Sequence, residues 1–444
     1  MQPVLAAGAF ALVAVGLAVQ PGAGALSTAT VCLGLALIAG LYRRRMLATL
    51  LLALFLLYGL VPVWAMQVIG GVPLSNWRGE LFAPEALHGA VRYYCVGFAM
   101  FALGVTLGLW VWQWIIPPAP RRGVALVPGR RAAWPAMVAL FLAGATAATF
   151  AGVTRDVWIG NASTAERFVM QATTIATIAA FGYNLEHLRR AGRPLAWLDL
   201  IPLLVAVLLA VQGFRFMLVA GMMTFAVSQR DRLSTRPAHV ARVAALALAA
   251  YLVLTLGMGV RAVAGAQGIS LAEAITQIDA TYLSYFIGAP EQTGMVALKY
   301  FTETSVPVLH GRTYLDAVFR LLPNALHTSF FDTLRPQDFV LTHFAWVSSW
   351  FRENELTIGA HLFLEGIINF GPRGGLWVAF AAGALIPVVD LLPARRDRFV
   401  PMLYGVSSFA FAAAWYGSSA FLKTTIYYVA VFLLLQLVHK IRLS

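Results

Sequence analysis

Residues with side chains suited to catalysis are concentrated in one stretch of this chain, residues 261–373. Near its end, polar residues recur at every fourth position among apolar ones, as Thr357, His361, Glu365 and Asn369. Four-residue spacing lays these residues along one face of a helix. A carboxylate and an imidazole one turn apart can form a general base and the group that orients it. Either Glu365 or His361 can act as the base, and Glu353 and Glu355 are further candidates for it.

The pair of His361 and Glu365 has two other interpretations. It can be a structural hydrogen bond inside a helix that enters a membrane, where polar groups face a cavity or another helix. Two ligands at this spacing are weak evidence for a metal ion, so we expect no metal. The sequence contains no glycine-rich nucleotide-binding fingerprint, and we expect no cofactor.

Arginines in the same stretch are suited to a highly charged anion. Arg312, Arg320, Arg335 and Arg352 are spaced at 8, 15 and 17 residues. This spacing is too irregular for one helix face, but it allows the side chains to converge from several short helices. A guanidinium group can hold two oxygens of a phosphate at once. Taken singly, each arginine is explained as well by solvation or by an ion pair.

Arg215 is placed by a tight turn outside this stretch. Residues 194–228 are apolar apart from Asp199, Gln212 and Arg215. As one helix they would reach about 52 Å, whereas the hydrocarbon core of a bilayer is about 30 Å thick. The chain must therefore turn back, and Gly213 provides the permissive backbone for that turn. Arg215 then lies at the membrane surface, either as an interfacial anchor or, as we predict, against an anion such as a lipid pyrophosphate.

Composition indicates the scaffold that positions these residues. The chain has 60% hydrophobic and 11% charged residues and a mean hydropathy of +0.76, far more apolar than a soluble domain. Its apolar runs have the length of membrane-spanning helices, about 20 residues each. We predict an all-α polytopic membrane protein with about twelve transmembrane helices, centred near residues 11, 34, 58, 103, 142, 177, 205, 221, 251, 383, 408 and 431.

The distribution of basic residues predicts the orientation. Short loops on one side of the predicted membrane, with the C-terminal tail, carry 19 of the 32 lysines and arginines. The positive-inside bias makes that side cytoplasmic, together with both termini. The net charge of +13 fits anionic headgroups. Nucleic acid is not expected, because the basic loops lack interleaved aromatic residues.

The predicted spans divide the chain into three regions. Residues 1–260 contain nine transmembrane helices, residues 261–373 form an extracytoplasmic loop, and residues 374–444 contain three transmembrane helices.

The predicted loop consists of short helices. Between Ser270 and Ile287, apolar residues recur at helical spacing and predict an amphipathic helix on the membrane or over the bundle. Pro323 and Pro336 divide the remainder into short pieces, which suits a lid or cradle better than one long helix.

Four motifs in order carry a family resemblance: Gly213-Phe-Arg215; Gly311-Arg-Thr-Tyr314 followed by Leu322-Pro323; Arg335-Pro336; and Glu365-Gly-Ile-Ile-Asn-Phe-Gly371 with Gly374. Together they resemble the Wzy-type polymerases, which join oligosaccharide repeat units at the bacterial inner membrane. The resemblance covers about residues 210–376. That family often has an arginine directly after the proline, where this chain has Asn324. If that arginine binds phosphate, its partner here must be another residue, such as Arg320.

The resemblance implies a metal-independent, GT-C-like glycosyltransferase whose active face is periplasmic. An undecaprenyl-pyrophosphate-linked oligosaccharide would be the donor, and a second lipid-linked repeat unit the acceptor. Membrane lipids and a Wzz-type chain-length regulator would be further partners. The implied roles are catalysis by Glu365, His361 and Arg215; pyrophosphate binding by Arg215, Arg312, Arg320, Arg335 and Arg352; and glycan binding by Tyr314, Glu353, Glu355 and Asn369.

Two alternative functions remain open. An O-antigen ligase would share this architecture and chemistry but transfer its glycan to lipid A core. A transporter or flippase for lipid-linked oligosaccharides would not be an enzyme, and would have polar residues near the middle of several spans. The middle positions of the spans predicted here are nearly all apolar, which argues against transport.

Overall fold

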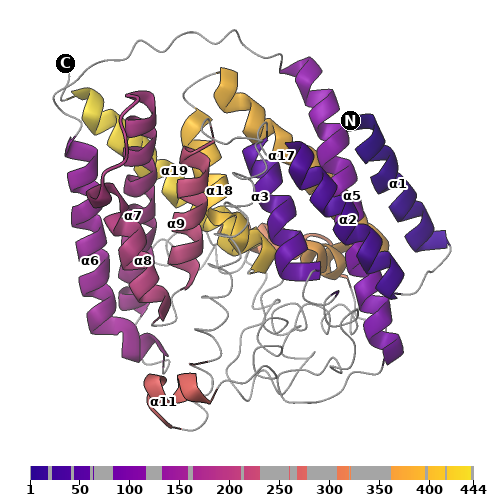
Figure 1. The fold of residues 1–444 in the computed structure, drawn as a ribbon, viewed down its shortest axis with the longest axis horizontal. Coiled ribbons are helices and arrows are strands. Elements are labelled where there is room, and N and C mark those ends of the chain that lie inside the picture. The colour runs from indigo at the N-terminus through magenta and orange to yellow at the C-terminus, as the bar shows by residue number, and fades with distance from the viewer. Residues whose placement is uncertain are drawn as a thin grey trace. The chain divides into compact units, whose positions relative to one another are not determined.

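The computed structural model of this chain is helical in every regular element of the residues it describes (Figure 1). The predicted all-helical class is therefore confirmed for those residues. The described residues are 2–18, 23–41, 45–60, 64, 84–116, 133–158, 164–211, 215–230, 260, 268–277, 308–319, 321, 362–395, 399–415 and 418–441.

The chain forms two compact units, and each unit combines segments that are distant in the sequence. Unit 1 contains Met1–Pro118, Ala280–Leu392 and Ala410–Lys423. Unit 2 contains Ala119–Asp279, Pro393–Phe409 and Thr424–Ser444. Residues from the N-terminal half and from the C-terminal part of the chain therefore share a core in both units.

Unit 1 is built around an aromatic cluster. Its helices are α1 (Gln2–Ala18), α2 (Ala23–Leu41), α3 (Met46–Leu54), the π-helix η1 (Phe55–Leu60), α5 (Pro84–Ile115), α13 (Arg312–Phe319) and most of α17 (Leu362–Arg395). Helix α5 packs against α1 and α2. The Phe363 ring of α17 lies 4.9 Å from that of Phe55, 5.3 Å from Tyr94 and 6.4 Å from Phe101, measured between centroids. These contacts fix the N-terminal part of α17.

Helices α5 and α17 approach each other at glycines. A Cβ atom on Gly104 would lie 2.1 Å from the carbonyl oxygen of Phe380, and one on Gly383 would lie 2.2 Å from that of Phe101. Only glycine fits such contacts, and small residues of this kind allow membrane helices to pack closely. The Trp112 indole N–H donates to the Ala384 carbonyl at 2.8 Å. These contacts hold the middle of α17 against α5.

The far end of α17 is fixed by a half-buried carboxylate. Asp390 accepts the backbone N–H groups of Leu47 and Ala48 at 2.9 and 3.0 Å. These are among the first N–H groups of α3, which have no acceptor within their own helix. A side chain far away in the sequence thus caps the start of α3.

Unit 2 combines α6 (Ala133–Trp158), α7 (Thr164–Arg190), the 3₁₀ helix η2 (Trp197–Leu200), α8 (Ile201–Val211) and α9 (Arg215–Ser228) with residues 400–409 of α18 (Val400–Trp415) and 424–441 of α19 (Ser418–Ile441). Helix α6 packs along α7, and α8 packs on α9 (Figure 1). Polar pairs bridge the helices: the Thr146 hydroxyl contacts that of Thr177, and Thr224 bonds to Ser408 at 2.6 Å.

The predicted turn after residue 211 agrees with this arrangement. Helix α8 ends at Val211, α9 begins at Arg215, and the two helices contact each other. The chain therefore reverses between them, as the apolar length of the segment required.

Four of the described helices are long and apolar enough to cross a membrane: Gly24–Leu41, Val91–Ile115, Leu362–Pro393 and Phe421–His439. They support the prediction of a helical membrane protein. The predicted centres of the spans fall on described helices, except for the one near residue 251, which lies outside the described residues. Twelve spans, their orientation and the inner membrane remain predictions, as does the GT-C-like loop.

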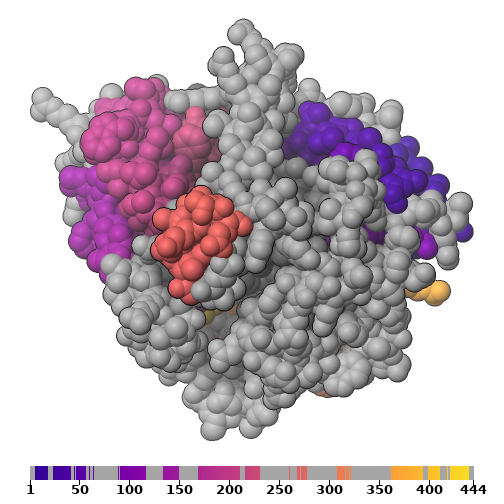
Figure 2. All heavy atoms as spheres, turned by 60° about the horizontal axis from the view of Figure 1, so that its bottom comes forward, coloured from indigo at the N-terminus to yellow at the C-terminus, as the bar shows by residue number. Residues whose placement is uncertain are grey.

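Only the first part of the predicted amphipathic helix is described, as α11 (Leu271–Thr276), which lies at the surface of unit 2 (Figure 2). Ser270 and Glu273 form a capping box: the Ser270 hydroxyl accepts from the Glu273 N–H, and the Glu273 carboxylate accepts the Ser270 N–H at 2.9 Å. Hydrogen bonds from the backbone and hydroxyl of Ser270 lower the pKa of Glu273. Residues 278–287 lie outside the described part.

Candidate functional site

The candidate site begins at a sharp bend in α17. Gly371 has φ 72° and ψ 176°, which breaks the helix between residues 370 and 372. The bend brings Gly366 and Gly375 together, and a Cβ on Gly366 would lie 2.9 Å from the Cα of Gly375. The Tyr93 hydroxyl of α5 supports the bend by donating to the Pro372 carbonyl at 2.8 Å. Residues 362–370 therefore form a short arm held at a fixed angle.

A second segment, residues 308–319, docks on this arm. The backbone N–H groups of Leu309 and His310 donate to the carbonyls of Ile368 and Asn369, at 3.0 and 2.8 Å. His310 and Gly311 then have positive φ, 49° and 85°, so the chain turns abruptly into α13. This turn brings the Gly311-Arg-Thr-Tyr314 motif against the Glu365 to Gly371 motif.

Glu365 is the centre of the contact. Its side chain is buried, and the residue is only 4% exposed. One carboxylate oxygen accepts the Thr313 hydroxyl at 2.8 Å and the Ser418 hydroxyl at 2.6 Å. The other accepts the Ser418 backbone N–H at 2.8 Å. Since Ser418 is the first residue of α19, Glu365 also caps that helix. One carboxylate thus joins α13, α17 and α19.

Asn369 completes the cluster one turn further along α17. Its amide Nδ2 donates to the Glu365 carbonyl at 2.8 Å and to the Thr313 hydroxyl at 2.5 Å. Its Oδ1 accepts the Thr313 backbone N–H at 3.3 Å. Asn369 is fully buried, so these bonds satisfy polar groups that water does not reach.

Tyr314 follows Thr313 and stacks on Phe370. The two rings are 6.2 Å apart between centroids and 21° from parallel, and Phe370 is 45% exposed. The Tyr314 hydroxyl is buried and has no hydrogen-bond partner among the described residues. Burial raises the pKa of Tyr314, and the nearby charge of Glu365 raises it further. The hydroxyl therefore stays protonated at neutral pH and can donate to a ligand.

The structure brings together three of the predicted site residues, Glu365, Asn369 and Tyr314. Arg312, the first residue of α13, is exposed and directly precedes Thr313. Arg215 is the first residue of α9 in unit 2, but its side chain lies outside the described part. The remaining predicted residues also lie outside it: Arg320, Arg335, Arg352, Glu353, Glu355 and His361. Convergence of the arginines on one site therefore stays a prediction.

Two members of the cluster were not predicted as site residues. Thr313 lies inside the Gly311-Arg-Thr-Tyr314 motif, so the motif could have indicated it as a site residue. Ser418 lies between the predicted spans centred near residues 408 and 431, and no motif there indicates a site residue. Among the described residues, no group of three or more histidine, cysteine or acidic side chains is arranged to hold a metal ion.

No family model, characterised protein or solved structure matches this sequence. The function must therefore be inferred from the chemistry of the residues.

Proposed function

We propose that this protein is a glycosyltransferase of the polysaccharide polymerase type, using a polyprenyl-pyrophosphate-linked glycan as donor. One observation carries the proposal. Two motifs more than forty residues apart, Gly311 to Tyr314 and Glu365 to Gly371, meet in one hydrogen-bonded cluster. The cluster places a carboxylate, an amide and a tyrosine hydroxyl together beside Arg312. The proposed transfer requires a base and positive charge, which a carboxylate and Arg312 can provide.

The chemistry needs little more than charge and a base. The bond between the anomeric carbon of the donor and the pyrophosphate oxygen breaks, and a bond from that carbon to an acceptor hydroxyl oxygen forms. The hydroxyl proton passes to a protein base, and the lipid pyrophosphate leaves as an anion. Guanidinium groups stabilise the developing negative charge without a metal. In the proposal, Arg215, Arg312, Arg320, Arg335 and Arg352 provide these groups.

Glu365 and His361 are the proposed base and its orienting partner, in either order. Three described donors surround Glu365 and fix the position of its carboxylate. This fixed position suits orientation of His361 as well as proton acceptance. Tyr314 and Asn369 are assigned to the glycan, with Glu353 and Glu355.

The experiment incubates the purified protein with a lipid-linked repeat unit and separates the products by size. We expect a ladder of longer glycans, formed without added metal. Arg215→Ala and Glu365→Ala should insert normally and give no ladder. Glu273→Gln, which changes an exposed carboxylate on α11, is the matched control and should retain the full ladder.

Each outcome has a defined meaning. Full activity in Arg215→Ala or Glu365→Ala removes that residue from the site. Transfer to lipid A core without a ladder assigns the chain to the ligases. Movement of the lipid-linked unit across vesicles without any new glycosidic bond refutes the transferase and indicates a flippase.

A further inference from the structure

The last residue of the short arm, Phe370, is a large apolar side chain that stays 45% exposed although its ring stacks on Tyr314. Two glycines give the ring its place. A Cβ on Gly374 would lie 2.2 Å from the Cβ of Phe370, so only glycine fits there. A Cβ on Gly311 would lie 3.6 Å from the tip of the ring. Phe370 is therefore held between the two motifs of the candidate site and still presents part of its ring outward.

The position of the bend in α17 places Phe370 at the edge of the membrane. Residues 374–392 form a helix about 28 Å long, which nearly matches a hydrocarbon core of about 30 Å. Arg373 directly precedes them and is exposed. Since an exposed arginine is costly inside the hydrocarbon core, Arg373 marks its edge. Phe370 lies beside it at the bend, where a ligand attached to a lipid headgroup would be found.

Tyr314 adds a hydrogen-bond donor to this aromatic surface. Its hydroxyl is buried and has no partner among the described residues. The backbone N–H and the hydroxyl of the preceding Thr313 are bound by Asn369 and Glu365, so α13 is fixed where Tyr314 begins. Leaving a buried hydroxyl unpaired costs free energy, which a ligand oxygen that accepts its hydrogen bond would recover.

A ligand that fits both groups must be apolar on one face and carry oxygen atoms at its edge. An acyl chain meets only the first condition, and a phosphate meets only the second. A pyranose ring meets both, because its C–H bonds form an apolar face and its hydroxyl groups surround that face. The C–H bonds are attracted to the negative face of an aromatic ring. Sites for small polar ligands commonly combine apolar walls with a few placed polar groups in this way.

We propose that Phe370 is a stacking platform for a pyranose residue of the lipid-linked glycan. The Tyr314 hydroxyl donates a hydrogen bond to an oxygen of the same sugar. This inference rests on the proposed glycosyl transfer. It adds Phe370 to the site and specifies the class of sugar, a pyranose whose C–H bonds are gathered on one face.

The test measures binding of soluble sugars to the purified full-length protein by saturation-transfer NMR, in a detergent without a sugar headgroup. The probes are methyl β-glucopyranoside and methyl β-galactopyranoside. Sorbitol, an acyclic polyol without a ring face, is the control probe. We expect at least one pyranoside to bind, with the strongest saturation on the C–H protons of one face, and no binding of sorbitol.

Four variants assign the binding to individual side chains. Phe370→Leu keeps an apolar side chain against Tyr314 but removes the ring, so it should weaken pyranoside binding about tenfold, or about 1.4 kcal/mol. Phe370→Tyr keeps the ring and should retain binding. Tyr314→Phe should weaken binding about two- to tenfold by removing one hydrogen bond. Trp377→Leu, which removes a 65% exposed aromatic ring from the same helix, is the matched control and should change nothing.

Hydrogen exchange in residues 312–319 checks that Phe370→Leu keeps α13 docked. Failure of both pyranosides to bind, binding of sorbitol as strong as theirs, or undiminished binding in Phe370→Leu overturns the platform.

Glycan transfer provides a separate measurement. Phe370→Leu should need about tenfold more lipid-linked repeat unit for half-maximal ladder formation, with the maximal rate unchanged. Pyranoside binding that depends on Phe370, in a wild-type protein that forms no ladder, supports the platform and refutes the transfer. A ladder that Phe370→Leu forms as well as the wild type at low substrate overturns the platform and leaves the transfer standing.

Discussion

Thr313→Val tests whether the hydroxyl cluster holds α13 on α17. Valine has nearly the shape of threonine but lacks the hydroxyl. The change removes the donor to Glu365 and leaves one N–H of the fully buried Asn369 without its acceptor. A hydrogen bond to a charged group contributes about 1.5–3 kcal/mol, and an unsatisfied buried donor costs about 1–3 kcal/mol. Since Glu365 keeps its bonds to Ser418, we expect docking to weaken by about 2–4 kcal/mol.

Hydrogen exchange measures this loss directly. If the amides of residues 312–319 exchange through local undocking, a loss of about 2–4 kcal/mol accelerates their exchange about 30- to 1000-fold. Peptides from α1 and α6 should be unchanged. Glycan transfer should fall with the docked fraction, because Arg312 and Tyr314 are then no longer held in position.

Thr313→Ser is the matched control. It keeps the hydroxyl and removes one methyl group, so exchange in α13 should stay within about tenfold of the wild type. Unchanged exchange in Thr313→Val would refute the reasoning, since the hydroxyl would then have no part in docking. Equal acceleration in both variants would assign the effect to the methyl group.

Three further predictions concern stability. Tyr314→Phe should leave stability at pH 7 unchanged or raise it by about 1 kcal/mol, because the buried hydroxyl has no described partner, while glycan transfer falls. Because burial raises the pKa of Tyr314, its contribution to stability is fully present below about pH 10 and declines as pH rises further, so the decline seen in thermal unfolding should be smaller in the phenylalanine variant. Gly104→Ala should destabilise by about 1–3 kcal/mol in thermal unfolding, whereas Gly89→Ala on the same helix, with open space around it, should not. Asp390→Asn should destabilise by about 1–3 kcal/mol, because its amide cannot accept both N–H groups at the start of α3, and exchange at Leu47 and Ala48 should rise.

Hydrophobic length and periodicity predicted much of the fold. The turn between α8 and α9 followed from the apolar length of residues 194–228, since one helix of that length would exceed the membrane thickness. The structure places the bend of α17 at Gly371, inside the Glu365 to Gly371 motif. The four-residue spacing of Glu365 and Asn369 likewise predicted their common face, where both contact Thr313.

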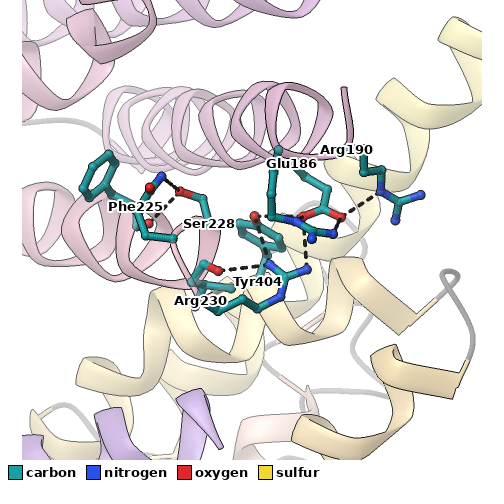
Figure 3. A network of polar contacts seen from close by, with 9 residues as sticks. Glu186, Arg190, Phe225, Ser228, Arg230 and Tyr404 are labelled. Atoms are coloured by element: carbon teal, nitrogen blue, oxygen red, sulfur yellow. Dashed lines mark hydrogen bonds and ion pairs between the residues drawn. The ribbon is translucent and has the colours of Figure 1, made fainter. Parts of the chain in front are cut away.

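Contacts between segments that are distant in the chain could not be predicted from the sequence. Nothing local to Ser418 indicates that its N–H and hydroxyl both reach Glu365, because that pairing depends on how α17 and α19 pack. The arginines at the end of α7 were interpreted only as topology signals. Arg189 and Arg190 bind Glu186 within one turn of α7, but Arg230 and Tyr404, which bind the same carboxylate, lie 44 and 218 residues away in the chain (Figure 3). Composition gives the number of charges, but tertiary packing decides which of them share a counter-ion.

Helix α17 has a carboxylate near each end, and each one caps the start of a different helix, α19 through Glu365 and α3 through Asp390. Sliding α17 lengthwise by one residue, about 1.5 Å, would break both caps together. Swinging the short arm about Gly371 would disturb the cap on α19 and the arm's contacts with Phe55 and residues 308–319, but it would leave the cap on α3 in place. Any opening of unit 1 that admits a bulky lipid-linked sugar should therefore be a pivot of residues 362–370, while the long arm keeps its register against α5.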